Sequence, residues 1–394
     1  MARTVAELPA GARITDYISL GVMSKSFPAG AIERVLASTG RASLRQRDLP
    51  AHVVVYYVIA LALYMQSSYR EVLRCLLEGI LWLRDPSARV RVAGKSGISQ
   101  ARTRLGWEPL RQLHDELVQP IAVRGTCGAW YRGWRLVSLD GSTLEVADEK
   151  VNEEAFGRPG ASRGASAYPQ IRFVSLVENG THVLFGSQMD SYRTGEITLA
   201  KTVLPRLGKG MLCLADRNFF GFALWQQAQG TGADLLWRMK KNMRLACESR
   251  LADGSYLSHV YPCERDWRHK THGIAVRVID YRLATTILNP NQAPASELAA
   301  LYHERWEIET AFDELKTHLR GARIVLRSKA PDLVRQEFYG LLMAHFAIRG
   351  LMHEAALKAN EDPDRLSFLH AVRVVRRKLA VYPAIPPSKE EGIS

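Results

Sequence analysis

The spacing of apolar residues changes twice along the chain, and this change restricts the possible folds most strongly. From about residue 31 to 117, apolar side chains recur every three to four positions, as on one face of a helix. From about 134 to 287 the apolar runs are short and bounded by Gly, Asn and Asp, which is typical of strands and turns. Helical spacing returns at about 297–320 and 333–357. This order predicts an all-helical first region followed by a mixed α/β fold.

Local patterns add detail to this outline. The segment 178–182, ENGTH, lies between two apolar runs and predicts a hairpin turn, whereas residues 222–229 are expected to form a helix. The longest apolar run, 52–65, is shorter than the roughly 20 residues that a bilayer span needs, so we expect a buried helix. The first residues lack the pattern of a secretory signal, and we expect cytoplasmic residence. The tail 386–394 is expected to be disordered.

The charge balance points to a polyanionic partner. The 394 residues include 53 Lys and Arg against 40 Asp and Glu, a net charge of +13. Nucleic acid is the partner that this excess favours, although an anionic membrane surface would satisfy the same arithmetic. The five cysteines contain no C-x-x-C pair of the kind found in zinc sites, so we expect them to be reduced and structural.

One basic helix in the first region is a candidate for reading DNA. A short helix is expected to begin near Gly97 and to project Gln100, Arg102 and Arg104 outward. Such a helix would enter DNA in the manner of a helix-turn-helix. The alternative is an ordinary solvated basic face.

Two aspartates follow predicted strands. Asp140 comes directly after the apolar run 135–139 and before Gly141, and Asp216 comes directly after the run 211–215. Neighbouring strands would bring the two carboxylates together, as a metal site requires. An Asp after a strand is also common in plain turns, so neither residue alone decides the matter.

A third acidic position lies in the predicted helix 297–320. Tyr302, Arg305, Glu309 and Lys316 fall within roughly 60° of one helix face. Asp313 lies on nearly the same face, so geometry leaves Glu309 and Asp313 both open. A solvated charged face with i,i+4 ion pairs is the alternative for the whole stripe.

The spacing Y-x2-R-x3-E-x6-K resembles the YREK signature of DDE transposases of the insertion-sequence-four type. The segments LVSLDGSTL, with Asp140, and CLADRNFFG, with Asp216, are similar to the two aspartate motifs of that family, in the same order. The resemblance covers about residues 134–321 and selects Glu309 over Asp313. The helical first region also resembles the additional N-terminal domain of this family.

The resemblance implies a ribonuclease H-like catalytic core, mixed α/β, that is interrupted by a β-rich insertion. The domains expected from it are a helical DNA-binding domain at 1–125, the first part of the core at 126–237, the insertion at 238–290, and the helical remainder at 291–385.

The implied chemistry is metal-dependent cutting and rejoining of DNA. Two metal ions about 3.5 to 4 Å apart would activate the nucleophile and stabilise charge on the phosphate. Asp140, Asp216 and Glu309 would be the catalytic residues and the metal ligands, and three carboxylates suit Mg²⁺, with Mn²⁺ able to substitute. Tyr302, Arg305 and Lys316 would contact the DNA near the cut.

The partners implied are double-stranded DNA, namely the terminal inverted repeats of a transposon and its target, and a second copy of the chain in a synaptic homodimer. The freed 3′ hydroxyl would attack another strand after nicking. Two alternatives remain open: a catalytically inactive sequence-specific DNA-binding protein, and a ribonuclease H-like nuclease without strand transfer. A metal-free hydrolase is less favoured, since the 11 histidines show no evident pairing with a nucleophile.

Overall fold

The structure is a computed structural model that describes residues 18–43, 49–84, 92–161, 164–165, 168–241, 243, 245–280, 282–322 and 324–376. Its first region is helical, as predicted, and the tail 386–394 lies outside the described residues. The helices of this region are α1 (Ile18–Ser26), α2 (Ala29–Ser38), α3 (Ala51–Leu63), α4 (Tyr69–Arg84), α5 (Lys95–Leu105) and α6 (Glu108–Leu117).

Helix α3 is the centre of the first region. Residues 53–63 are all buried, which confirms the prediction of a buried helix. It packs against α13 (Pro331–Ala359), and a Cβ added at Gly340 would lie 2.9 Å from the backbone oxygen of Val58. The glycine therefore lets the two helices cross with their backbones in contact. Among the described helices, none is both long enough and apolar enough to cross a bilayer.

A ten-stranded mixed sheet forms the second half of the fold. Its order is β6-β5-β2-β7-β8-β12-β11-β10-β9, with β1 paired to β2. The β2–β7 and β7–β8 pairs are parallel, and the other pairs are antiparallel. The strands are β1 (Trp130–Tyr131), β2 (Trp134–Glu145), β5 (Gln170–Glu178), β6 (Val183–Ser191), β7 (Met211–Ala215), β8 (Asp234–Arg238), β9 (Ser249–Arg250), β10 (Tyr256–Val260), β11 (Ile274–Ile279) and β12 (Leu283–Thr285).

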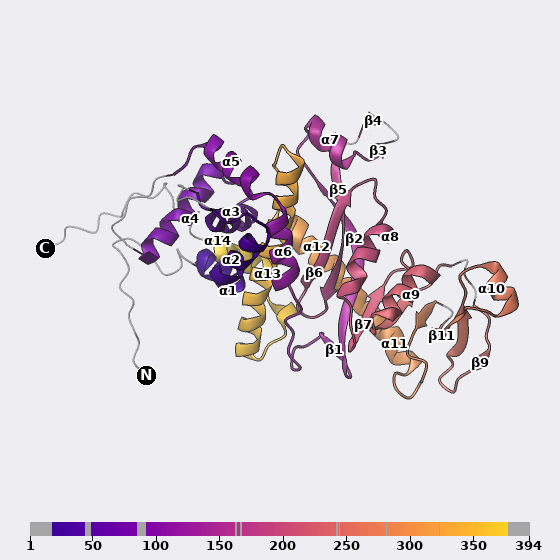
Figure 1. Ribbon diagram of the computed structural model, residues 1–394. Helices are drawn as coiled ribbons and strands as arrows, with labels where there is room; N and C mark the ends of the chain where they lie inside the picture. The colour runs from indigo at the N-terminus through magenta and orange to yellow at the C-terminus, as the bar shows by residue number, and fades with distance from the viewer. Residues whose placement is uncertain are drawn as a thin grey trace.

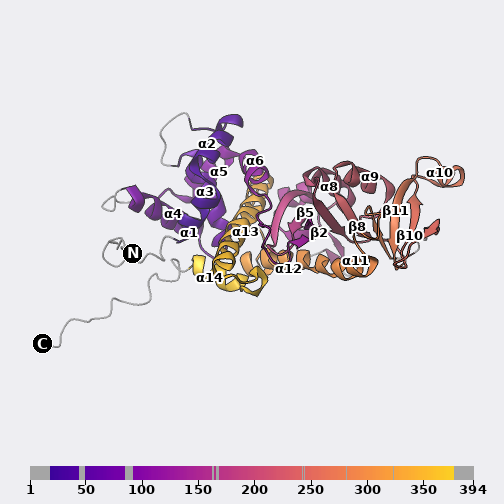
Figure 2. The same ribbon diagram turned by 90° about the horizontal axis from the view of Figure 1, so that it is seen from below.

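Helices cover both faces of this sheet. Figure 2 shows α8 (Glu196–Val203) and α9 (Phe222–Gly230) on one face, and α11 (Ala295–Leu301) and α12 (Glu307–Asp313) on the other. Helix α13 lies between the first region and the sheet, whereas β9, β10 and β11 lie at the opposite end (Figure 1). The predicted hairpin at 178–182 joins β5 to β6, and α9 confirms the helix predicted at 222–229. Shorter elements are α7 (Lys150–Phe156), β3 (Gly160–Ala161), β4 (Gly164–Ala165), α10 (Glu264–His269) and α14 (Phe368–Arg376).

The predicted helix at 297–320 is continuous, but its winding changes along its length. Helix α11 passes into a 3₁₀ stretch, η3 (Tyr302–Trp306), which passes into α12. A π-helical stretch, η4 (Glu314–Leu319), follows α12 directly. Changes of this kind inside a helix occur frequently at functional sites.

Candidate active site

Asp140 and Asp216 lie side by side on neighbouring parallel strands. The last residue pair between β2 and β7 is Leu139 with Ala215, and the two aspartates are the residues that follow this pair along the chain. The expectation that both follow a strand end is confirmed for Asp216 and wrong for Asp140. Strand β2 continues to Glu145 because its antiparallel partner β5 keeps pairing with it after β7 has ended. Asp140 therefore lies inside its own strand, β2, beside the point where the neighbouring strand β7 ends.

Arg305 joins two of the predicted carboxylates. Its Nη1 donates to Asp140 Oδ2 at 3.4 Å, and its Nη2 donates to Glu309 Oε1 at 3.1 Å. The Arg305 side chain is only 9% exposed, whereas that of Glu309 is 45% exposed. The structure thus brings the helix residue Glu309 to the strand residue Asp140 across one guanidinium group.

The surroundings of Asp140 oppose its negative charge. Burial, with a smaller contribution from the nearby carboxylates of Glu196 and Asp216, raises the pKa of Asp140 to about 6, against the lowering effects of the Gly141 N–H and Arg305. Like charges held this close are stabilised by a cation. The donor set consists of carboxylate oxygens, and these are the ligands that hard divalent ions prefer.

Glu196 is a fourth carboxylate of the site that the sequence did not reveal. It begins α8, and a Cβ added at Gly141 would lie 3.0 Å from its carboxyl carbon, so the missing side chain of Gly141 makes room for it. Asn218 Nδ2 donates to Glu196 Oε2 at 2.8 Å. A Glu in the first turn of a helix is ordinary, since the helix dipole favours it, so its sequence signal is weak. We call Asp140, Glu196, Asp216 and Glu309 the carboxylate cluster.

The remaining residues of the predicted stripe also face β2 and β7. The Tyr302 hydroxyl donates to the Ala215 carbonyl at 3.2 Å, one residue before Asp216. Lys316 Nζ donates to Ser142 Oγ at 3.0 Å, two residues beyond Asp140, and burial lowers the pKa of Lys316. Asp313 instead contacts His318 at 3.3 Å, with its side chain 56% exposed. Of the two candidates left open by helix geometry, Glu309 therefore shares Arg305 with Asp140, whereas Asp313 pairs with His318.

The basic helix of the first region is only partly as predicted. Gln100 and Arg104 of α5 are exposed, but the outward orientation expected for Arg102 is wrong. Arg102 lies four residues after Ile98 and three before Leu105, on the buried face of the helix. It donates to Gln336, to Ser328 and to the carbonyl of Leu333, which ties α5 to the second half of the chain.

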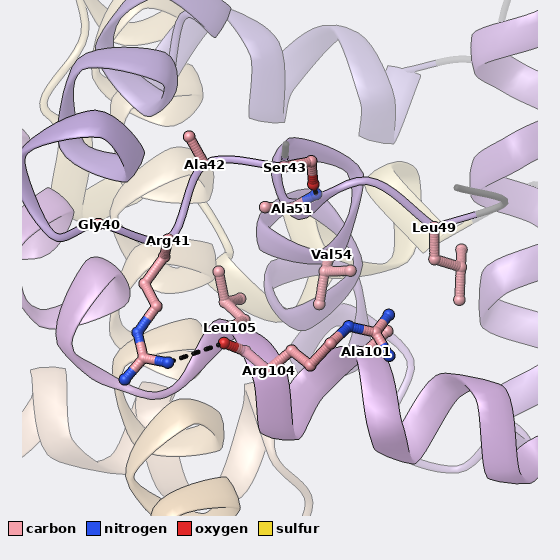
Figure 3. A pocket seen from close by; sticks show the side chains of 10 residues that line it. All are labelled: Gly40, Arg41, Ala42, Ser43, Leu49, Ala51, Val54, Ala101, Arg104 and Leu105. Carbon is pink, nitrogen blue, oxygen red and sulfur yellow. Dashed lines mark hydrogen bonds between the residues drawn. The ribbon is translucent and has the colours of Figure 1, made fainter. Parts of the chain in front are cut away.

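Arg104 lies beside a second arginine. Arg41 Nη1 donates to the backbone carbonyl of Arg104 at 3.1 Å, and both residues line a hollow between α5 and the segment that precedes α3 (Figure 3). Both side chains border this hollow, and Figure 3 shows their guanidinium groups pointing in different directions.

Comparison with known families assigns the chain. A model described as "Transposase DDE domain" matches residues 132–347, more than half of the chain. The chain belongs to the DDE transposases. A second model, "Insertion element 4 transposase N-terminal", matches residues 17–115, so the helical first region belongs to the same group.

Two curated relatives agree with this assignment. The transposase is 27% identical over 372 residues to "Transposase InsG for insertion sequence element IS4" of Escherichia coli (strain K12), covering 91% of this chain and 82% of the relative. It is 24% identical over 231 residues to "Putative transposase InsZ" of the same organism, covering 58% of this chain and 74% of the relative.

The family confirms the predicted fold class and activity. The mixed sheet with helices on both faces belongs to the ribonuclease H-like fold of this family, and the helical first region precedes it. The protein is an insertion-sequence transposase, an enzyme that cleaves DNA strands and transfers them to other DNA. Its substrate is DNA, and its reaction uses divalent metal ions.

Proposed function

We propose that Asp140, Asp216 and Glu309 form the metal-binding catalytic site of this transposase, with Mg²⁺ as the natural ion and Mn²⁺ able to substitute. The observation that supports this most directly is the bridge from Asp140 through Arg305 to Glu309, with Asp216 on the adjoining strand. Three acidic residues distant in sequence meet beside the carboxyl end of β7, an interior strand of the sheet. When bound, the ions would activate the attacking hydroxyl and stabilise charge on the phosphate.

The residues around the metal ligands have positioning roles in this proposal. Arg305 holds Asp140 and Glu309 in place, and Glu196 adds negative charge next to Asp140. Tyr302 and Lys316 lie on either side of these carboxylates along the helix, where they would contact phosphates near the cut. Of the residues predicted on α5, Gln100 and Arg104 remain candidate DNA contacts because they are exposed.

We further propose that the DNA consists of the terminal inverted repeats of the insertion sequence and a target duplex, joined by a homodimer in the bacterial cytoplasm at the nucleoid. Residues 1–125 would bind DNA. Residues 238–290 would be an insertion into a core formed by 126–237 and 291–385. In support, β12 pairs with β8, so most of this segment adds strands at one edge of the core sheet.

A test uses the full chain with labelled duplex DNA carrying the two ends that flank its gene. Mg²⁺ should give nicks at the ends and then joined products, Mn²⁺ should replace it, and a chelator should stop both steps. Nicking without joining would identify a nuclease rather than a transposase. Specific end binding without nicking in either metal would identify an inactive DNA-binding protein and contradict the proposed site.

A further inference from the structure

A second group of metal-ligand side chains lies outside the carboxylate cluster. His182, Glu307 and Asp364 each offer a ligand atom, and these atoms lie within 4.8 Å of one another. They come from three segments: the turn between β5 and β6, the first residue of α12, and the 3₁₀ turn η5 (Pro363–Arg365). We call these three residues the histidine cluster.

The imidazole of His182 is buried and oriented by a carboxylate. Its side chain is 5% exposed, and its Nδ1 lies 3.1 Å from Glu314 Oε1. Glu314 is held in turn by His345 at 3.2 Å and by Arg349, whose guanidinium also contacts Nδ1. A guanidinium can only donate, so Arg349 and an Nδ1–H cannot share this contact. In the tautomer with the proton on Nδ1, Nδ1–H donates to Glu314, Arg349 bonds Glu314 alone, and the lone pair is on Nε2. A carboxylate on the far nitrogen is the usual support of a metal-binding histidine.

The Nε2 atom of His182 faces the other two ligands without a hydrogen bond of its own. It is buried and has no hydrogen-bond partner among the described residues. It lies 3.3 Å from Asp364 Oδ1 and 3.8 Å from Glu307 Oε2. Two ligands of a tetrahedral ion, each about 2.1 Å from it, are roughly 3.4 Å apart. The observed separations are close to this value.

The charges around the cluster also favour a cation. Three carboxylates, those of Glu307, Asp364 and Glu314, lie around His182, and the guanidinium of Arg349 is engaged by Glu314. The N–H of Gly180 donates to Glu307. Buried carboxylates are costly unless a positive charge is close.

We propose that the histidine cluster binds one divalent transition-metal ion, of which Zn²⁺ is the best match. An imidazole with two carboxylates suits Zn²⁺, whereas Mg²⁺ prefers oxygen ligands alone. The ion would join the β5–β6 turn, α12 and η5, and so fix the start of α12 two residues before Glu309. This site is separate from the catalytic one and does not depend on the proposed function.

The test measures Zn²⁺ affinity of the full chain without DNA. The variants are made in a background with Asp140→Asn and Glu309→Gln, which weakens metal binding by the carboxylate cluster. Competition with a colorimetric chelator should show one Zn²⁺ per chain, and Co²⁺ in its place should give visible absorption typical of a site with an imidazole ligand. His182→Gln and Asp364→Asn should each weaken Zn²⁺ binding by at least about tenfold and remove the Co²⁺ bands.

Glu361→Gln is the matched control, because Glu361 precedes the same turn but pairs with Arg365 instead. It should bind Zn²⁺ like the background. Asp364 is 37% exposed, so its replacement by Asn should not prevent folding, which circular dichroism would verify. If the background chain retains no Zn²⁺, or if Asp364→Asn binds it unchanged, the proposal is wrong, whatever the nicking assay shows.

Discussion

The carboxylate cluster and the histidine cluster both use α12, yet they differ in exposure. Glu309 is 45% exposed and Asp140 is 25% exposed, whereas Glu307 is 12% and His182 is 5% exposed. An arginine lies next to each cluster: Arg305 pairs with Glu309 of the first, and Arg349 pairs with Glu314, which supports His182 of the second. DNA can approach the first cluster but not the buried imidazole of the second. Asp364 of the histidine cluster is itself 37% exposed, so the difference in exposure lies in His182 and Glu307 and not in every acid of the two clusters.

The largest expected effect is on DNA cleavage, and it should come from substitutions in the carboxylate cluster. Asp140→Ala, Asp216→Ala or Glu309→Ala should each reduce cleavage by about a thousandfold or more, because metal ions contribute several kcal/mol of transition-state stabilisation. Binding to the ends should persist, since phosphate contacts dominate affinity. Labelled-end cleavage and gel-shift assays measure the two quantities. Full cleavage by one variant would remove that residue from the site.

Substitutions around the histidine cluster should instead lower the stability of the fold, and Glu314, which contacts His182, tests this. Glu314→Gln leaves Arg349 without its charged partner, which should lower the free energy of unfolding by about 3–5 kcal/mol. Urea unfolding measures the loss, with Glu361→Gln as an exposed control that should change little. A loss below about 1 kcal/mol would mean that the two clusters do not differ in the way proposed.

Substitution of Lys316 tests whether the active site extends beyond the carboxylate cluster. Its Nζ is anchored to Ser142 beside Asp140, so Lys316→Ala should displace the DNA from the reacting geometry and lower the cleavage rate by about a hundredfold. Lys316→Arg should restore part of the rate. Single-turnover cleavage with saturating DNA is the measurement. An alanine variant with the normal rate and affinity would make Lys316 part of a solvated face.

The smallest effect concerns pH in the absence of metal. The pKa of Asp140 in the folded chain, about 6, is above its unfolded value, so ionisation costs stability as the pH rises through 6. Asp140→Asn should therefore be more stable than the unaltered chain by about 2 kcal/mol at pH 8, and the gain should vanish near pH 4. Thermal melts with a chelator at both pH values measure it. A gain independent of pH would contradict the assigned burial of this charge.

The sequence predicted three of the four residues of the carboxylate cluster and none of the histidine cluster. Asp140 and Asp216 follow apolar runs, and Glu309 belongs to a spaced motif, so both signals were local. Glu196 and Glu307 each stand in the first turn of a helix, where acids are common for another reason, the helix dipole. Their roles depend on which strand or turn they meet, and that is set by tertiary packing.

For Arg102 the sequence suggested a functional role in DNA contact, but the structure shows a buried residue with a structural role. Its neighbours Gln100 and Arg104 suggested a uniformly basic surface, but the helical period places Arg102 with Ile98 and Leu105. Its hydrogen-bond partner Gln336 is 234 residues away in sequence, so no local sequence pattern could predict the contact. The mixed α/β fold was predictable because periodicity is local. The buried polar contacts were not, because they join distant segments.

The change of winding around α12 has a consequence for the rotational phase of the motif. A 3₁₀ stretch advances about 120° per residue about the helix axis and an α-helix about 100°, whereas a π stretch advances less. Residues Tyr302–Trp306 are thus overwound and Glu314–Leu319 underwound, and the two deviations act in opposite directions. The angular positions of Arg305, Glu309 and Lys316 are set by this compensation as well as by their spacing in sequence. Deleting Leu315, which precedes Lys316 in the π stretch, would keep all four residue types of the motif while turning Lys316 away from Ser142.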